Sequence, residues 1–275
     1  MKRGIILRLF ELLWLPSIKP SNIAIDIIIP TIEKDLTILP LCIEGLRKNV
    51  NHPIKNIYIV GPNILSIRDF CTKENLIFVD EYSVFNFNPQ DLKVHITSSG
   101  KIINRSGWIF QQLIKLSGKI GTEDNYLCID SDHILLNKHT FIDKDGIPIF
   151  YMSSENHKPY YKNIKRLLPS MGLSQLSYVA HKMIFNKKHV NELHKEIEKY
   201  SKNDWIKTII NSLDLNETSS FSEFEIYGNF IKKKHLRPWK QKQLSYKEID
   251  TYKNLEKKYN KYNSITFPEW YSNNK

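Results

Sequence analysis

The stretch NYLCIDSDHILL, at residues 125–136, decides the fold of this sequence and points to its chemistry. Its apolar run has no period-two alternation, which predicts a β-strand buried on both faces. Asp130 and Asp132 interrupt the run, and neighbouring carboxylates are costly to bury unless a cation lies between them or they face a cleft. A strand end followed by an ordinary Asp-Ser turn explains the same letters, so the neighbouring segments must decide between the two interpretations.

Three more apolar segments lie upstream, and helical patterns alternate with them. Strands that are apolar on both faces and alternate with helices are typical of a mostly parallel central sheet covered by helices. We therefore predict a Rossmann-like α/β fold. The predicted strands are IAIDIIIPT (23–31), NIYIVGP (56–62) and NLIFVDE (75–81), and the predicted helices are LTILPLCIEGLRKNV (36–50) and SGWIFQQLIKLSG (106–118).

The second half of the chain continues with two more strand-like segments and two helices. The segments IPIFYMS (147–153) and LSYVAHKMIF (176–185) predict strands, and NKKHVNELHKEIEKYS (186–201) and SSFSEFEIYGNFI (219–231) predict helices. No internal repeat or linker divides them. We expect one domain at residues 23–240, an N-terminal helix at 1–22, a helical C-terminal elaboration and a basic tail at 241–275.

The charge of the chain calls for an anionic partner. Lysine and arginine number 40 against 29 aspartates and glutamates, which gives a net charge of +11. Nucleic acid, an anionic lipid surface or a phosphorylated substrate would each suit this excess. The longest apolar run, IILRLFELLWLP at 5–16, is too short to span a bilayer and contains Arg8 and Glu11. It fits an amphipathic or core helix, with an interfacial anchor as the alternative.

The cysteines indicate the compartment. Cys42, Cys71 and Cys128 lie far apart in apolar surroundings, which is typical of reduced core thiols rather than of a disulfide framework or a zinc site. We therefore expect a cytoplasmic protein. Its basic, tyrosine-dotted C-terminal tail also suits peripheral attachment to the inner face of the cytoplasmic membrane.

The two acids at the end of the predicted strand can share one cation. Residues i and i+2 of an extended segment point the same way, so Asp130 and Asp132 can face one ion together. Carboxylate oxygens are hard ligands, which favours Mn²⁺ or Mg²⁺ bridging to substrate phosphates. In open α/β sheets, ligands bind beyond the carboxyl ends of the strands, where Pro30, Thr31 and both acids fall.

The order of these motifs resembles a known class of enzyme. A strand ending in Pro-Thr, a strand ending in Gly-Pro, a helix and an apolar strand with DxD are similar to a GT-A glycosyltransferase. The segments GWIFQQLIKL, YLCIDSDHILL, YVAHKMIF and SEFEIYGNF, in this order, resemble DUF6492, a bacterial family of glycosyltransferase-like proteins from polysaccharide gene clusters. The resemblance covers roughly residues 23–240. It implies a GT-A-like fold and transfer of a sugar from a nucleotide-sugar donor.

The resemblance also implies a donor site. Asp130 and Asp132 would bind the metal and the donor diphosphate, and Pro30 and Thr31 would lie where GT-A enzymes receive the nucleotide. On the helix before the DxD strand, Gln111 and Lys115 are four residues apart and share a face, so they could contact the donor sugar or diphosphate. A solvated polar face is the alternative for that pair. His181 could be a third metal ligand or a core residue, and His133 competes with it for the metal role.

Two further groups of residues are candidates for acceptor chemistry. Glu223 and Glu225 follow Ser222 or Ser220 as a predicted helix cap, where acids also simply complement the helix dipole. In inverting GT-A enzymes, a carboxylate at such a position accepts the proton of the acceptor hydroxyl, so both are candidate catalytic residues. The predicted acceptor pocket after the strand at 147–153 contains Glu155, His157 and Tyr160.

These patterns lead to one function and two rivals. We expect a metal-dependent glycosyltransferase that acts on a cell-surface glycan such as lipopolysaccharide, O-antigen or capsule, with a glycan or lipid-linked glycan as acceptor. A nucleic-acid-binding protein is the first rival, but no RNP-like, zinc-finger or helix-turn-helix signature occurs, so we expect no nucleic acid partner. A metal-dependent nuclease or phosphotransferase is the second, although no GxxxxGK[ST] loop occurs.

Overall fold

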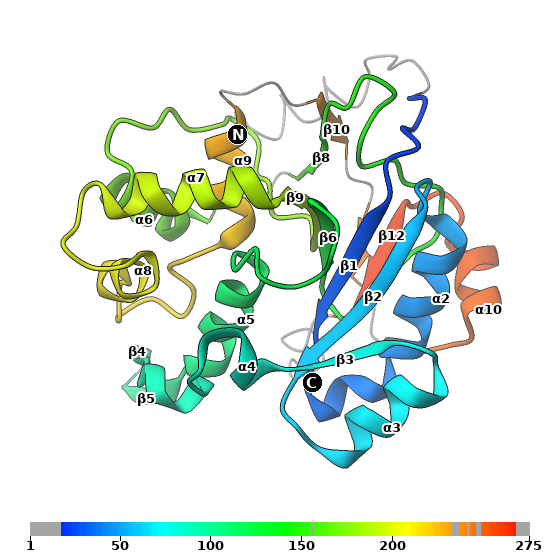
Figure 1. Cartoon of the computed structure of the whole chain (residues 1–275), viewed down its shortest axis with the longest axis horizontal. Helices are drawn as coiled ribbons and strands as arrows, with labels where there is room; N and C mark the ends of the chain where they lie inside the picture. The colour runs from blue at the N-terminus through cyan, green and yellow to red at the C-terminus, as the bar shows by residue number, and fades with distance from the viewer. Residues whose placement is uncertain are drawn as a thin grey trace.

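The central sheet of the protein has five strands in the order β3-β2-β1-β6-β9 (Figure 1). Its strands β1, β2, β3 and β6 pair in parallel, and β9 runs antiparallel to β6 at one edge. The computed structural model describes residues 18–98, 100–153, 155, 157–232, 237–240, 243–245 and 249–267. The strands are β1 (Ile25–Pro30), β2 (Ile54–Gly61), β3 (Ile77–Asp80), β6 (Asn125–Ile129) and β9 (Lys182–Asn186).

Helices cover both faces of this sheet, which confirms the predicted mostly parallel α/β architecture (Figure 1). One face carries α2 (Leu39–Asn49) and α3 (Leu65–Lys73), and the other carries α5 (Ser106–Lys115), α7 (Lys187–Glu198) and α9 (Glu223–Ile231). The remaining helices are α4 (Glu81–Phe85), α6 (Lys158–Leu167), α8 (Trp205–Ser212) and α10 (Tyr252–Lys258), with two 3₁₀ turns, η1 (Glu33–Thr37) and η2 (Pro89–Leu92).

Short strands complete the fold outside the central sheet. A hairpin of β4 (His95–Ser98) and β5 (Lys101–Asn104) precedes α5. The strand β7 (His133–Leu135) follows the DxD turn and pairs antiparallel with β12 (Ser264–Thr266), which in turn pairs with β11 (Gln243–Ser245). The strand β8 (Ile149–Met152) pairs with β10 (Arg237–Lys240).

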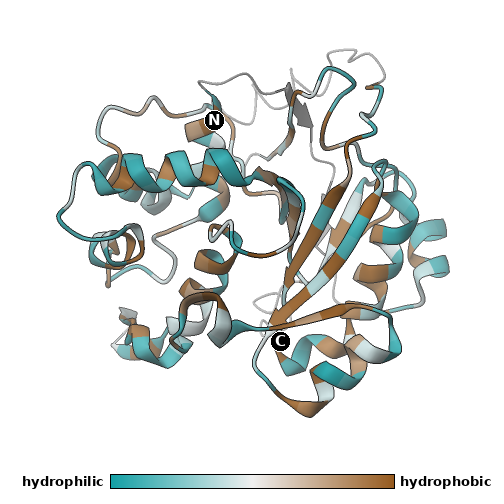
Figure 2. Cartoon of the chain, in the orientation of Figure 1, coloured by the Kyte–Doolittle hydropathy of each residue, from teal (hydrophilic) through white to brown (hydrophobic). Residues whose placement is uncertain are grey.

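The core lies between the sheet and its helices, and apolar strands form its centre (Figure 2). Every residue of β1 is buried, including Asp26, whose carboxylate accepts hydrogen bonds from the backbone N–H groups of Thr122 (2.6 Å) and Glu123 (2.8 Å). Gly121 approaches this carboxylate with a positive φ of 84°, a conformation that suits glycine because it lacks a Cβ. A buried acid is therefore compatible with β1 because two backbone donors satisfy it.

The C-terminal segment is part of this packing. Tyr252 and Leu255 of α10 are buried against α2, and the Tyr252 hydroxyl donates to the Leu135 carbonyl at 2.8 Å. Ile265 of β12 is fully buried beside β7. Residues 249–267, which the sequence assigned to a basic tail, therefore contribute to a second hydrophobic cluster in this fold.

Three local features differ from the sequence-based prediction or fall outside the described part. The predicted N-terminal helix at 1–22 lies outside the described residues, except for its last five. The strand predicted at 176–185 begins only at Lys182, because His181 has a positive φ of 58°. Pro40 lies in the first turn of α2, where its missing N–H costs no helical hydrogen bond. None of the described helices is long and apolar enough to cross a bilayer.

Candidate functional site

The DxD motif lies at the carboxyl end of β6, which runs between β1 and β9. Backbone hydrogen bonds define its turn: the Asp130 N–H donates to the His181 carbonyl, and the His133 N–H donates to the Asp130 carbonyl, both at 3.0 Å. The hydroxyl of Ser131 donates to Asp35 of η1 at 2.9 Å, so the middle residue of the motif is bonded to a neighbouring element. The turn is thereby held from β9 on one side and from η1 on the other.

Asp130 is the centre of a chain of ion pairs. Its Oδ1 lies 2.5 Å from Nζ of Lys115 on α5, and its Oδ2 lies 2.9 Å from Nδ1 of His181. The same Lys115 ammonium lies 2.7 Å from Oε1 of Glu223, the first residue of α9. The helix α5, the DxD turn after β6 and the helix α9 therefore meet at one positive charge, the Lys115 ammonium.

Electrostatics favours the charged forms of Asp130 and Lys115. Burial alone raises the pKa of Asp130, but the charges of Lys115 and His181 outweigh burial and lower that pKa below its ordinary value. Burial lowers the pKa of Lys115, and the nearby Asp130 and Glu223 carboxylates more than reverse this and raise it. Burial raises the pKa of Glu223, although Lys115 opposes this effect. Lys115 is thus a fixed, buried positive charge.

Asp132 lies in a different environment from its partner in the motif. It is half-buried, and its carboxylate forms no hydrogen bond or ion pair within the ranges that the structure describes. Burial and the neighbouring charge of Asp130 raise its pKa to about 6. A carboxylate in this position would be stabilised by an additional cation.

The donor set fits a divalent cation of the hard type. No group of three or more His, Cys, Asp and Glu side chains that could hold a metal occurs among the described residues. Mg²⁺ is, however, usually bound through one or two carboxylates together with substrate phosphates. Asp132, with its unpaired carboxylate, and Asp130 beside it supply those two carboxylates. The residues present therefore suit a metal that arrives with a phosphorylated substrate.

The two histidine candidates for the metal have different partners. The ring of His181 bonds Asp130, and the ring of His133 stacks on it at 5.5 Å between centroids and 19° between planes. His133 is fully buried, and its Nε2 lies 3.0 Å from Nζ of Lys182. Of the two, His181 is the residue whose side chain contacts the DxD carboxylates. Its role as a metal ligand stays a prediction.

The other predicted donor residues lie at the same end of the sheet, but not all of them face the ion-pair chain. Thr31 follows β1, is buried, and donates its hydroxyl to the Ile29 carbonyl at 3.1 Å, which leaves Pro30 and Thr31 as backbone neighbours of the site. Gln111 is half-buried on α5. Its neighbour Gln112 is the glutamine that reaches α9, because its Oε1 accepts the backbone N–H of Glu223 at 3.3 Å.

The two glutamates at the start of α9 point to different places. Ser222 caps the helix, since its hydroxyl accepts the Glu225 N–H at 3.3 Å. Glu223 joins Lys115, whereas Glu225 accepts hydrogen bonds from the hydroxyls of Ser177 and Tyr161 and from the amide of Asn229. Burial raises the pKa of Glu225 to about 7. Of these two glutamates, Glu223 is the one that pairs with Lys115, which in turn pairs with Asp130.

The predicted acceptor residues lie beside the segment that leads into α9. His157 Nε2 lies 2.5 Å from the Ser219 carbonyl, and the hydroxyls of Tyr160 and Ser219 are 2.6 Å apart. Burial raises the pKa of Glu155, while the positive charges of His181 and His157 oppose that shift. Glu155 therefore lies within electrostatic range of the DxD histidine, and the loop after β8 borders the site.

Sequence reasoning missed four residues of this site. Lys182 and Gln112 are buried polar residues in apolar segments, and that conflict with their surroundings was the signal available. Asp35 and Ser177 carried no such signal, because their partners lie 96 and 48 residues away along the chain. Their contacts depend on the tertiary fold alone.

A family model described as a family of unknown function, DUF6492, matches residues 23–273. The chain belongs to DUF6492. The match includes the C-terminal segment that packs on α2 and β7, so this segment is part of the family's shared sequence. No curated protein matches the chain.

Solved structures similar to this DUF6492 chain include two kinds of transferase. The apo form of mouse xyloside xylosyltransferase 1 aligns over 90% of this chain and 98% of its own, with a TM-score of 0.48 and 8% identity. Two structures of LgtC, a galactosyltransferase with donor and acceptor sugar analogues and an active-site mutant, align over 88% of this chain and 87% of their own. Their TM-scores are 0.48 and their identities 11%, values too low to assign an activity.

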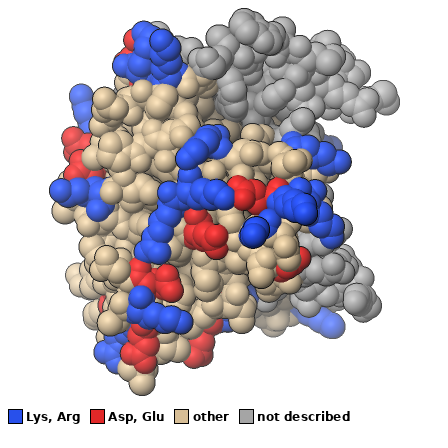
Figure 3. All heavy atoms as spheres, turned by 90° about the vertical axis from the view of Figure 1, so that its right-hand side faces the viewer, with Lys and Arg blue, Asp and Glu red and all other residues tan. Residues whose placement is uncertain are grey.

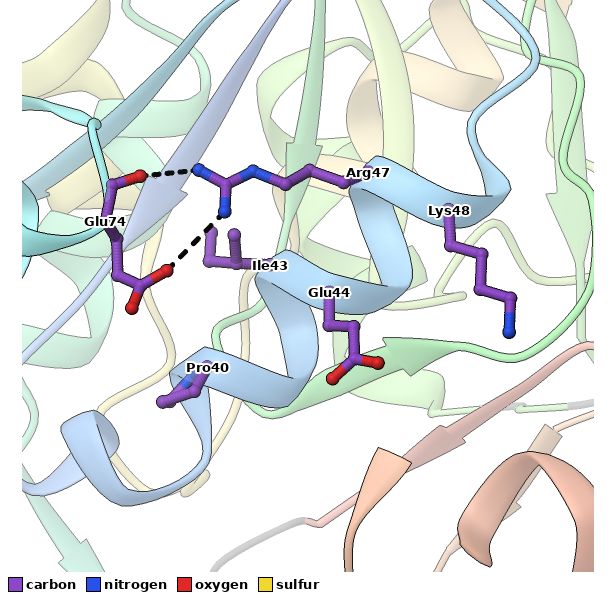
Figure 4. A pocket seen from close by; sticks show the side chains of 6 residues that line it. All are labelled: Pro40, Ile43, Glu44, Arg47, Lys48 and Glu74. Carbon is purple, nitrogen blue, oxygen red and sulfur yellow. Dashed lines mark hydrogen bonds and ion pairs between the residues drawn. The ribbon is translucent and has the colours of Figure 1, made fainter. Parts of the chain in front are cut away.

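A surface groove of about 550 Å³ lies on the outer side of α2, away from the residues described above (Figure 4). Pro40, Ile43, Glu44, Arg47, Lys48 and Glu74 line it. Arg47 is held across it by two contacts with Glu74, at 2.5 Å to the carbonyl and 3.5 Å to the carboxylate. Arg47 and Glu74 are thus paired within the groove, and none of the predicted site residues of the DUF6492 chain lines it.

Lysines and arginines lie among acidic residues on the side of the molecule that carries α2 and α10 (Figure 3). Arg47 and Lys48 end α2, and Lys257 and Lys258 end α10. Lys48 pairs with Glu256 at 2.7 Å, which joins the two helices. We refer to these four basic residues of the DUF6492 chain as its basic face.

Proposed function

We propose that this DUF6492 chain is a glycosyltransferase that takes a sugar from a nucleotide-sugar donor. The observation that carries the proposal is the cluster at the carboxyl end of β6: two carboxylates one residue apart, one free and one bound to a buried ammonium. A free carboxylate suits a metal ion, and a fixed ammonium suits a diphosphate, so the pair matches the two charges of a metal-bound nucleotide diphosphate.

The residues of this chain would divide the work as follows. Asp130 and Asp132 hold Mn²⁺ or Mg²⁺, which when bound neutralises the diphosphate leaving group. Lys115 adds a second, permanent positive charge beside that group, and Gln111 and the Pro30–Thr31 backbone border the donor. His181 orients Asp130 and is the third candidate ligand. Burial of Lys115 strengthens its field, because little water screens it.

Glu223 is the candidate base for the acceptor hydroxyl. Its Oε1 bonds Lys115, which leaves Oε2 for a hydroxyl proton if the reaction inverts the sugar. Glu225, two residues later, instead accepts a hydrogen bond from the hydroxyl of Ser177 and supports the loop that contains it. Glu155, His157 and Tyr160 border the same region and would contact the acceptor glycan.

The charge of the chain is the basis for a proposed acceptor and location. A cell-surface glycan such as lipopolysaccharide, O-antigen or capsule, lipid-linked and assembled at the inner face of the cytoplasmic membrane, would bring an anionic surface to the protein. The basic face on α2 and α10 supports this proposal, since each lysine or arginine near such a surface contributes about 1 kcal/mol of attraction.

The decisive experiment is a binding screen. UDP-, GDP- and CMP-sugars are added in turn with Mn²⁺, and the melting temperature and the heat of binding are measured. We expect one nucleotide class to bind with metal and to lose at least tenfold in affinity in EDTA. Asp132→Asn should remove the metal dependence, while Lys48→Gln, on the distant basic face, should bind as wild type does. Metal-independent binding, or binding of none of the donors, would contradict the proposal.

A further inference from the structure

Lys182, the first residue of β9, is a buried amine next to the site that no predicted role uses. Only 1% of its surface is exposed. Its Nζ lies 3.0 Å from Nε2 of His133, 3.2 Å from Oγ of Ser264 and 5.0 Å from the centre of the Tyr151 ring. These neighbours belong to β7, β12 and β8, so the amine is the point where four strands meet.

Packing alone does not explain a lysine at this position. Burying an amine costs free energy that hydrogen bonds only partly return. Methionine, with a side chain of similar length, would fill the space beside Tyr151 equally well. The amine therefore adds directional contacts, with His133 and Ser264, that a methionine would not supply.

The amine determines how the His133 ring is oriented. Nε2 of this ring contacts Lys182, and Nδ1 has no hydrogen-bond partner in the part of the chain that the structure describes. The contact with Lys182 is thus the polar interaction that fixes the rotation of the ring. The ring then presents one face to His181, at 5.5 Å and 19°.

His181 connects the His133 ring to the DxD motif, because it stacks on that ring and bonds Asp130. Its φ of 58° is in the left-handed region, which is unfavourable for a residue with a Cβ. This conformation turns the ring of His181 toward the motif, where its Nδ1 bonds Asp130 Oδ2 at 2.9 Å. Packing against the His133 ring limits the rotation of the His181 side chain.

We propose that Lys182 is a positioning residue for the DxD site: its amine fixes the His133 ring, and the stacked His181 ring then fixes the carboxylate of Asp130. Lys182 touches neither donor nor acceptor. This inference rests on the proposed function only in placing the donor at Asp130. The C-terminal strand completes the arrangement, since Thr266 is the register partner of His133 and the Phe267 N–H donates to the Asp132 carbonyl at 3.1 Å.

The test is a double-mutant cycle of Lys182→Met and His133→Phe. Lys182→Met keeps the shape of the core but leaves Nε2 of the buried His133 without the amine, so we expect a folded protein with a lower melting temperature and a roughly 10–100-fold loss of kcat/KM, the usual effect of removing a partner behind a metal ligand. His133→Phe keeps an aromatic ring against His181. If Lys182 acts through His133, adding Lys182→Met to His133→Phe should reduce kcat/KM by less than about twofold further.

A matched control and two opposing results complete the cycle. Ser264→Ala removes a second hydrogen bond of the amine but leaves the contact with His133, so it should stay within about twofold of wild type. Transfer by Lys182→Met at the wild-type rate would overturn the inference. Losses in the two single variants that multiply in the double variant would also overturn it.

A spectroscopic measurement separates this inference from the proposed function. In the metal-free protein, Lys182→Met should move the ring ¹⁵N signals of His133 and His181 and leave those of His194, which stacks on Trp205, unchanged. Moved signals in a protein that transfers no sugar would refute the proposed function alone. Unmoved signals in a protein that transfers sugar would refute the positioning role alone.

Discussion

The two halves of the central sheet, β3-β2-β1 and β6-β9, bury side chains of different chemistry. On the β3-β2-β1 side, the strands pack isoleucines and valine against α2 and α3, and the buried Asp26 is bonded to backbone donors (Figure 2). On the β6-β9 side, the core contains Lys115, Lys182 and Glu223, none more than 6% exposed. Apolar packing tolerates substitutions of similar volume. Lys115 and Glu223 form a buried ion pair, and such a pair does not tolerate the loss of one member, so we expect substitutions in the half of the sheet that carries the candidate site to be the more destabilising.

The largest expected effect tests this contrast within the DxD motif itself. Asp130→Asn should lower the free energy of unfolding by about 3 kcal/mol, because it leaves the buried Lys115 ammonium with one carboxylate instead of two. Asp132→Asn should leave it unchanged or slightly raised, since this residue has no partner to lose and its charge repels Asp130. Urea unfolding in metal-free buffer at pH 7.5 measures both. Equal losses in the two variants would remove the distinction.

A smaller effect tests whether the charged side also depends on close packing. A Cβ added at Gly228 in α9 would lie 2.3 Å from the ring of Tyr178, so Gly228→Ala should lower the free energy of unfolding by about 1–3 kcal/mol. Gly107 in α5 has nothing within 4 Å of its would-be Cβ. Gly107→Ala should therefore raise stability by about 0.5 kcal/mol. Thermal unfolding of both variants gives the comparison, and a stable Gly228→Ala would show that α9 can shift.

The smallest effect concerns acid stability on the same side. Burial lowers the pKa of His194 to about 4, against an ordinary value of 6.5. The unfolded chain therefore takes up a proton below pH 6.5 that the folded protein does not, and stability falls as the pH drops from 6.5 toward 4. His194 should account for about 1 kcal/mol between pH 6.5 and 5.5, because the unfolded histidine is only half protonated at pH 6.5. His194→Phe keeps the stack on Trp205, and it should make the urea midpoint depend less on pH over that interval. A pH dependence equal to that of the wild type would assign the effect to other histidines.

The sequence predicted the part of this molecule that local patterns encode. Apolar runs at 23–31, 56–62 and 125–129 form β1, β2 and β6, and the structure confirms Ser222 as the cap of α9. The four-residue spacing placed Lys115 and Gln111 on one helix face, and the apolar run placed Asp130 at the carboxyl end of a strand. Both residues could therefore be predicted to lie near one ligand site. The assignment of roles to these residues stays a prediction.

The remainder depends on contacts between distant segments. Lys182 meets His133 at a separation of 49 residues and Ser264 at 82, so no window of sequence contains the cluster. The positive φ of His181 ends the strand that its apolar neighbours predicted. The segment at 249–267 carries many lysines, and its few buried positions, Tyr252, Leu255 and Ile265, were too sparse to indicate a core.

The pairing of β12 with β7 also sets the order in which the molecule can be completed during translation. The Asp132 carbonyl receives its hydrogen bond from Phe267, so the DxD turn has its final support only after the ribosome has released that residue. Domains emerge from their N-terminal ends, and β1, β2 and β6 can associate much earlier. A nascent chain therefore exposes a formed sheet with an unfinished site. The support of the DxD turn by Phe267 is therefore added after the strands of the central sheet.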